Sequence, residues 1–474
     1  MTRRPVEDAS TTSGLPVSPG LGPTLVAADI GRREKALTRR SLLIVLLSMV
    51  IALITVPVAR SLVFLIGFIT NLAFFGRLSG ELVSPAGAQI GVVLVCIPVA
   101  GAVIVGLMAR YGSAAIRGHG IPEAMEQILT NESRIPMRMT FLKPLSAAIA
   151  IGTGGPFGAE GPIIATGGAL GSLLGQLVHV TGDERKTLLA AGAAAGMTAI
   201  FGTPFSAILL TIELLVFEFR PRSFIPVAAA ALAAIALRPT LFSSEPLFHL
   251  SHLPPAPPAA LGAYVLEGAA MGLLAILMSR SIYLIEDLFE RLPFHWMWWP
   301  ALGGLVVGVI GLVAPHTMGV GYENIDRILS GQFTGTAVVV FCLLKFVSWS
   351  IALGSGTSGG TLAPIFTIGG GLGVATGEIL QRLMPSAGVD LRMAALIGMA
   401  ASFAGASRAL FASVVFALEV TGQFNCLLPL LAGCTSAFLV SALTMTNTIM
   451  TEKLARRGHH VPSEYGPVMP RQPL

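Results

Sequence analysis

Long apolar stretches, broken by glycine and proline, dominate the chain. Two of them come first, at about residues 42–75 and 90–108, and a second pair follows at roughly 226–242 and 259–284. A helix needs about 20 apolar residues to cross a bilayer. The pattern therefore predicts membrane-spanning helices, and the chain as a whole is predicted to be an all-α polytopic membrane protein.

The segments between these runs have a different texture. From residue 118 to 219 the apolar pieces are short, polar residues interrupt them at 131–138 and 183–186, and the same broken texture returns from Met318 onward. The chain also holds 54 glycines and 31 prolines. At membrane depth, backbone polar groups freed at a helix break must find partners inside the protein or in a water-filled cavity. We therefore expect tilted and broken helices around a cavity.

Two parts of the chain repeat each other. Residues 152–176 align with 354–378 at a constant offset of 202, with ten identities in 25 positions, and residues 192–213 align with 398–419 at an offset of 206. Collinear offsets in two windows indicate a duplicated segment. Matching glycine- and proline-interrupted segments in two halves are typical of a transporter whose substrate site lies near the bilayer midplane.

The composition favours a single membrane domain. Hydrophobic residues make up 53% of the chain and charged residues 12%, whereas soluble domains carry about 25% charged residues. An ordinary soluble enzyme is therefore excluded. We predict a disordered tail at 1–36 without a signal peptide, a membrane domain at 37–458 with repeat halves at about 85–220 and 300–450, and a short tail at 459–474.

The charge distribution predicts the orientation. The net charge is +5, and the excess lies at the flanks of the membrane domain, for example at Arg39, Arg40, Arg456 and Arg457. Basic flanks are retained on the cytoplasmic side, so both termini are expected there and no nucleic-acid partner is expected. The four cysteines show no paired or metal-type spacing, and we expect neither a metal nor a cofactor.

One carboxylate stands alone at membrane depth. Between Pro144 and Thr181 the only charged residue is Glu160, which lies just where a helix can begin with Pro162 in its first turn. Such residues are costly in a bilayer and usually face a functional cavity. The alternative is that Glu160 only caps its own helix. A helix N-terminus attracts anions, so a tethered carboxylate and a free anion would compete for one place, and protonation of Glu160 would decide between them.

Two further segments have the form of a flexible, glycine-bearing helix start. Backbone N–H groups directed at one point would bind an anion weakly enough to release it. The two segments are Gly118-His119-Gly120-Ile121-Pro122-Glu123-Ala124 and Gly360-Thr361-Leu362-Ala363-Pro364.

Together these motifs resemble those of the CLC family of chloride channels and chloride/proton antiporters, over about residues 40–458. The resemblance implies two inverted-topology repeats of tilted and broken helices around a midplane anion site. It also implies a homodimer with an anion path in each subunit, in the bacterial inner (plasma) membrane. The short tail resembles the prokaryotic type without cytoplasmic regulatory domains. The residues that carry the resemblance are the two segments above, Gly158-Ala159-Glu160-Gly161-Pro162, residues 190–196 and Phe416-Ala417-Leu418-Glu419-Val420-Thr421.

The resemblance also assigns roles to particular residues. Glu160 corresponds to the gating glutamate of the family, which binds protons. The residues implied to bind the anion are His119, Gly120, Ile121, Gly161, Thr361, Leu362 and Met450.

Four positions depart from the family pattern. His119 replaces a serine, and we expect it to contact the anion and to make transport rise as cytoplasmic pH falls; the alternative is a ring turned aside to a carbonyl. Leu362 replaces a phenylalanine whose contact is through its backbone amide. Met450 stands in place of an anion-coordinating tyrosine, and Leu214 in place of the second glutamate that relays protons.

Because leucine cannot titrate and methionine is a poor hydrogen-bonding group, we predict chloride transport that is channel-like or weakly proton-coupled. The alternatives are a coupled chloride/proton antiporter and a fluoride/proton exporter. Glu213 and Glu218 are candidates for the proton path, although Glu213 and Glu419 also suit buried structural hydrogen bonds. Lys345 and Arg408 are isolated among apolar residues and can pair with carboxylates or extend to an interface.

An enzyme is a remote alternative. Gly356-Thr357-Ser358-Gly359 matches the motif of intramembrane serine proteases, which need a histidine base on a later membrane helix. The only histidines after Ser358 are His459 and His460, in the basic tail. We therefore expect no enzymatic activity.

Overall fold

The computed structural model describes residues 39–243, 245–459 and 461, and in these residues it is all helical, with no strand longer than an isolated bridge. The predicted tails at 1–36 and 459–474 lie outside the described residues, apart from His459 and Val461. The principal helices are α2 (Arg39–Thr70), α3 (Val93–Leu107), α4 (Ile121–Thr130), α5 (Met139–Gly152), α6 (Glu160–Leu177), α7 (Gly182–Phe201), α8 (Pro204–Thr211), α9 (Pro221–Leu237), α10 (Pro258–Glu290), α11 (Trp299–Val313), α12 (Tyr322–Leu329), α13 (Gly335–Gly354), α14 (Leu362–Leu383), α15 (Leu391–Ser407), α16 (Leu410–Thr421), α17 (Leu427–Thr444) and α18 (Glu452–Arg456).

Eight helices of the described chain are long and apolar enough to cross a membrane. The four long apolar runs of the sequence fall on α2, α3, α9 and α10, as predicted. The described chain also has shorter apolar helices: α5 and α8 lie between α3 and α9, and α15 and α16 lie between α14 and α17. The predicted polytopic all-α architecture with broken helices is confirmed.

The first helix defines the two faces of the molecule. With its final π-helical turn, α2 runs from Arg39 to Phe75, 37 residues, or about 55 Å, which exceeds the thickness of a bilayer core. Arg40 at its start pairs with Glu184 in the first turn of α7. Asn71 at its other end donates to the carbonyl of Glu81, 2.8 Å away, so the loop after α2 lies at the opposite face.

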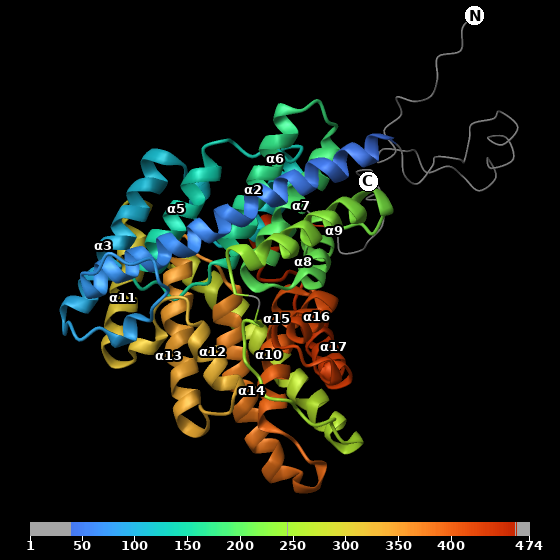
Figure 1. Ribbon diagram of the computed structural model, residues 1–474. Helices are drawn as coiled ribbons and strands as arrows, with labels where there is room; N and C mark the ends of the chain where they lie inside the picture. Colours follow the sequence, from blue (N-terminus) through green and yellow to red (C-terminus); the bar gives the residue numbers. More distant parts are fainter. Residues whose placement is uncertain (1–38, 244, 460, 462–474) are drawn as a thin grey trace, which may run out of the picture.

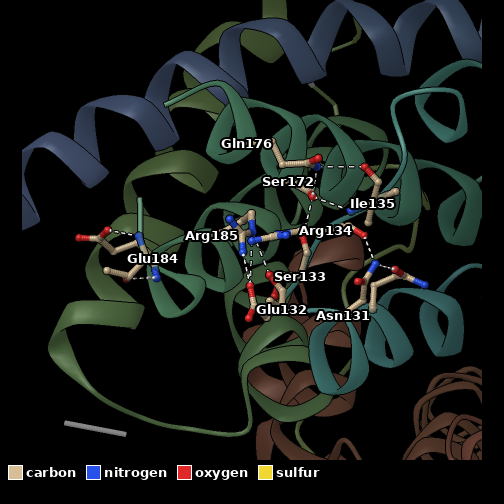
Figure 2. Close-up of polar contacts among 11 residues, drawn as sticks. Asn131, Glu132, Ser133, Arg134, Ile135, Ser172, Gln176, Glu184 and Arg185 are labelled. Carbon is tan, nitrogen blue, oxygen red and sulfur yellow. Dashed lines mark hydrogen bonds and ion pairs between the residues drawn. The ribbon is translucent and has the colours of Figure 1, made fainter. Parts of the chain in front are cut away.

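The loop between α4 and α5 lies at the same face as the start of α2 and is held by polar contacts (Figure 2). Arg185 of α7 donates to the carbonyl of Glu132 at 2.8 Å, and Ser172 of α6 accepts from the backbone N–H of Ile135 at 2.9 Å and donates to the carbonyl of Ser133 at 2.6 Å. These contacts fix the end of α4 against α6 and α7, and therefore also the start of α4, which forms part of the site.

The two halves of the chain use the same glycine contacts. In the first half α6 and α7 cross at Gly167 and Gly192, where a Cβ on Gly167 would lie 2.2 Å from the carbonyl oxygen of Gly192. In the second half α14 and α15 cross at Gly369 and Gly398, where the equivalent distance is 2.6 Å. Small residues allow membrane helices to approach closely. Gly167 and Gly369 are 202 residues apart and Gly192 and Gly398 are 206 apart, which are the two offsets of the sequence repeat. Figure 1 shows the blue-to-green first half beside the yellow-to-red second half.

Each half also caps a helix of the other. The carboxylate of Glu213 accepts two backbone N–H groups in the first turn of α16, at 3.1 and 2.9 Å. The carboxylate of Glu419 accepts the two equivalent N–H groups in the first turn of α8, at 3.0 and 2.7 Å. These bonds satisfy N–H groups that a helix start leaves unpaired. The two glutamates therefore join the repeats by reciprocal hydrogen bonds.

Candidate anion site

The interrupted segments predicted from the sequence meet between the two halves. The N–H of Gly118 donates to the carbonyl of Thr357 at 2.9 Å. Gly158 and Gly360 exchange backbone hydrogen bonds in both directions, at 3.2 and 3.0 Å. The segments that precede α4, α6 and α14 are thus joined, although more than 200 residues separate the first from the last.

Glycines allow these main chains to approach. A Cβ on Gly161 would lie 2.0 Å from the carbonyl oxygen of His119, and one on Gly120 would lie 2.4 Å from the carbonyl oxygen of Gly161. Gly118 and Gly120 also have φ values of +102° and +98°, which side chains other than glycine's rarely adopt. The sequence Gly118-His119-Gly120 therefore serves both the turn and the contact with α6.

The carboxylate of Glu160 lies at the junction of the helix starts. Glu160 is fully buried, and its Oε1 accepts a hydrogen bond from the Tyr322 hydroxyl at 2.7 Å. Its Oε2 lies over the glycine backbone, 1.7 Å from where a Cβ of Gly158 would be. The backbone amides of Glu160 and Ala363, at the starts of α6 and α14, stabilise the negative charge of the carboxylate, and so does the positive charge of Lys345. The carboxylate thus lies where helix N-termini favour an anion.

Two buried lysines stabilise the loops that enter the site. Lys143 of α5 donates to two carbonyls just before α4, both at 2.8 Å, and Lys345 of α13 donates to two just before α12, at 2.8 and 3.4 Å. The lysines are 202 residues apart, so they are equivalent in the two repeats. Lys345 therefore donates to carbonyls and makes no ion pair with a carboxylate among the described residues. Arg408 likewise donates to carbonyls at the end of α17.

The predicted anion-binding residues are buried, and most of them lie at this junction. His119 is 5% exposed, and its Nδ1 has no hydrogen-bond partner in the described chain, so that atom is not turned to a carbonyl. Thr361 and Leu362 are fully buried at the start of α14. Met450 is fully buried between α17 and α18, where its N–H donates to the Thr448 hydroxyl at 3.2 Å.

The two glutamates proposed for the proton path lie elsewhere. Both carboxylate oxygens of Glu213 are engaged in capping α16. Glu218 accepts from the Ser223 hydroxyl and lies 3.7 Å from Arg220. Neither glutamate is hydrogen-bonded to Glu160 or to another residue of the three motifs in the described structure.

Cavities approach the site from both faces. The larger one, about 840 Å³, lies at the face where α2 begins; it is lined by Glu123 of α4, Lys143 and the basic residues of α18. The smaller one, about 90 Å³, lies at the opposite face, between residues 82–85 of the loop after α2 and residues 318–324. Tyr322 lines the smaller cavity and donates to Glu160. Glu123 lines the larger cavity and accepts from the N–H of Gly120 at the start of α4.

Sequence reasoning missed Tyr322 and Lys143. A signal for both was present, because residues 319–322 repeat the glycine spacing of 118–121 at an offset of 201, next to the offset that relates the two lysines. Gly319 and Gly321 have φ values of +67° and +79°, so both turns have left-handed glycines. Tyr322 therefore occupies in the second half the place of Ile121 in the first.

Convergent helix starts within a polytopic membrane fold, with a buried carboxylate among them, define the class of protein as an anion transporter. Comparisons identify the family. A family model described as voltage gated chloride channel matches residues 100–442. The chain belongs to the CLC family, and the recognition from sequence motifs is confirmed.

Particular relatives and solved structures agree with this assignment. The chain is 30% identical over 366 residues to the H(+)/Cl(-) exchange transporter ClcA of Yersinia pestis bv. Antiqua (strain Angola), covering 74% of each protein. A slow cyanobacterial Cl-/H+ antiporter has the same fold with a TM-score of 0.78 at 22% identity, over 89% of this chain and 98% of that one. A CLC-type fluoride/proton antiporter gives 0.69 at 23% identity, over 85% and 97%. The protein is therefore a multi-pass membrane protein of a family that transports anions.

Proposed function

We propose that the protein exchanges chloride for protons across the bacterial inner membrane. In this proposal Glu160 binds the proton, and its ionised carboxylate occupies the site of the anion. The observation that carries this proposal is the position of the Glu160 carboxylate at the starts of α6 and α14. When Glu160 is protonated, its affinity for the helix N-termini falls and chloride can replace it.

The comparisons favour exchange over the channel-like transport expected from Leu214 and Met450. The relative from Yersinia pestis is named an exchanger, and the solved structures described above are antiporters. Glu213 and Glu218 remain candidates for the inner part of the proton route, with Glu218 the freer of the two because Glu213 caps α16 through both oxygens.

The anion site is proposed to consist of Gly120, Ile121, Gly161 and Thr361 together with the residues at positions 119, 362 and 450. Backbone amides would supply most of the contacts, which accounts for the tolerance of leucine at position 362. His119 would add a ring N–H from the side of the larger cavity. The charges of Glu123, Lys453 and Lys143 interact electrostatically with the His119 ring.

The proposed subunit arrangement and orientation follow from the same features. We propose a homodimer that buries α8 and α16, because both carry exposed phenylalanines, Phe205 and Phe411. The face that holds the larger cavity and the basic start of α2 is proposed to be cytoplasmic, in accord with the retention of basic flanks. Both termini would then be cytoplasmic.

The test is reconstitution in liposomes with opposing gradients of chloride and protons. An inward chloride gradient imposed on wild-type protein should drive protons outward against their own gradient, whereas Glu160→Gln should pass chloride without moving protons. The same vesicles tested with fluoride and with nitrate distinguish the substrates. If chloride flux through the wild type never moves protons against their gradient, the protein is a channel and the exchange proposal is wrong. If only fluoride drives proton movement, the protein is a fluoride exporter.

A further inference from the structure

A tyrosine hydroxyl holds the Glu160 carboxylate in its place. The hydroxyl of Tyr322 donates to Oε1 of Glu160 at 2.7 Å, and Oε2 has no hydrogen-bond partner among the described residues. Among the described residues, this bond is therefore the one hydrogen bond that a side chain makes to the carboxylate. Glu160 is fully buried, and a charge-assisted bond in such a setting is among the stronger hydrogen bonds in proteins.

The ring of Tyr322 is fixed by the elements around it. Tyr322 is the first residue of α12 and follows Gly321, whose left-handed conformation (φ +79°) turns the chain into the helix. Its ring centroid lies 6.1 Å from that of Phe201 at the end of α7 and 6.3 Å from that of Phe248 in the loop before α10. Aromatic neighbours on two sides leave the hydroxyl directed at Glu160.

Other groups near the carboxylate act differently. Lys345 of α13 is the charged side chain that acts on Glu160 in the described structure, and its ammonium is engaged with the carbonyls of Thr317 and Gly319. The amides of α6 and α14 would serve chloride and carboxylate alike. Tyr322 differs because its hydroxyl reaches the carboxylate from the cavity at the proposed outer face.

We propose that Tyr322 is a positioning residue that holds ionised Glu160 in the anion site and so sets the pH at which the pathway opens. The inference rests on the proposed gating role of Glu160. The phenol donates to the ionised carboxylate more strongly than to the protonated one. Loss of the hydroxyl therefore favours the protonated, displaced glutamate and opens the pathway at higher pH.

The test compares chloride efflux from liposomes for wild type and Tyr322→Phe as a function of pH. This substitution keeps the ring and its contacts with Phe201 and Phe248. We expect the pH of half-maximal efflux to rise by about one unit, and efflux at neutral pH to rise about tenfold, which is the ratio that corresponds to about one pH unit. Tyr264→Phe is the matched control, because that buried tyrosine accepts its hydrogen bond from the N–H of Asp390, remote from the site.

Variants at Glu160 separate this inference from the proposed function. If Glu160→Gln raises efflux and removes its pH dependence, the gating role stands, and the further change Tyr322→Phe in that background should have no added effect. Superimposable pH curves of wild type and Tyr322→Phe would then overturn the role of Tyr322 alone. An additive effect of the two changes would also overturn it, since Tyr322 would act independently of Glu160. If Glu160→Gln has no effect, the gating proposal fails first.

Discussion

At the scale of single residues, the site depends on glycines that leave room for a carboxylate. Oε2 of Glu160 lies over Gly158 and Gly360, 1.7 and 3.1 Å from where their Cβ atoms would be. The sequence predicted Glu160 because an isolated carboxylate in an apolar stretch is costly. Tyr322 could not be predicted in the same way, because its contact with Glu160 joins positions 162 residues apart and its local sequence only marks a helix start.

Gly158→Ala should displace Glu160 from the anion site. The new methyl group would occupy the place of Oε2, and the flexible carboxylate can move away more easily than the backbone. We expect chloride efflux at neutral pH to rise and to depend less on pH, as in Glu160→Gln. Proteoliposome efflux measures this. Gly262→Ala is the control, since its Cβ would meet nothing within 4 Å. Efflux and pH dependence unchanged in a folded Gly158→Ala protein would show that the carboxylate does not lie at Gly158.

At the scale of helices, the reciprocal caps of Glu213 and Glu419 were foreseen only as one of two roles. For Glu213 the sequence offered both structural hydrogen bonding and a place in the proton path, and for Glu419 it favoured structural hydrogen bonding. The structure gives both glutamates equivalent partners, and equivalence by the repeat indicates a structural role.

Glu213→Gln and Glu419→Gln should therefore destabilise the protein by similar amounts. Each replaces a group that accepts two N–H bonds through two oxygens by an amide with one acceptor oxygen, at a cost of about 1–3 kcal/mol. Thermal unfolding in detergent measures the loss, and Glu323→Gln at an exposed position is the control. Should Glu213→Gln alter the ratio of chloride to protons while its stability stays normal, Glu213 belongs to the proton path.

The ion pair between Glu123 of α4 and Lys453 of α18 makes a contribution to stability that depends on pH. Glu123 of α4 accepts from the N–H of Gly120 and from Lys453 of α18, both at 2.6 Å. Burial raises the pKa of Glu123, but the charges of Lys453 and Lys143 outweigh it and hold that pKa below its ordinary value. A carboxyl whose pKa is lowered by folding stabilises the folded state above about pH 4 and loses that effect as the pH falls further.

Lys453→Met should remove most of this stabilisation. We expect the variant to unfold more easily by about 3 kcal/mol at pH 7, the loss typical of breaking a buried pair, and the difference from wild type to shrink in acid. Unfolding in detergent at pH 7 and at low pH measures both. A deficit in stability that is as large in acid as at pH 7 would contradict the role given to the Glu123 charge.

At the scale of the whole molecule, the repeat explains why so much of the fold could be predicted. The apolar runs predicted the membrane-spanning helices, and the constant offsets predicted which segments of the two halves are equivalent. The subunit interface could not be located this way, because lipid and a second subunit both accommodate apolar side chains. Phe205 and Phe411, 64% and 56% exposed, are equivalent in the two repeats and lie in the first turns of α8 and α16.

Phe205→Ala combined with Phe411→Ala should weaken the proposed dimer. Truncation of a residue that is a hot spot of an interface costs about 2 kcal/mol or more. If both phenylalanines are hot spots, we expect a monomer at concentrations where the wild type is dimeric. Native mass spectrometry or single-molecule photobleaching in liposomes measures the state. Phe64→Ala, at an exposed position of α2, is the control. A double variant that stays dimeric would place the interface elsewhere.

The central claim is that the helix starts form an anion site which Glu160 fills when it is ionised. The most direct test is anomalous diffraction from crystals of Glu160→Gln grown in bromide. We predict a bromide peak between the starts of α6 and α14, surrounded by the backbone amides of Gly161 and Leu362. Crystals that diffract well but show no bromide there, or only at the protein surface, would contradict the account.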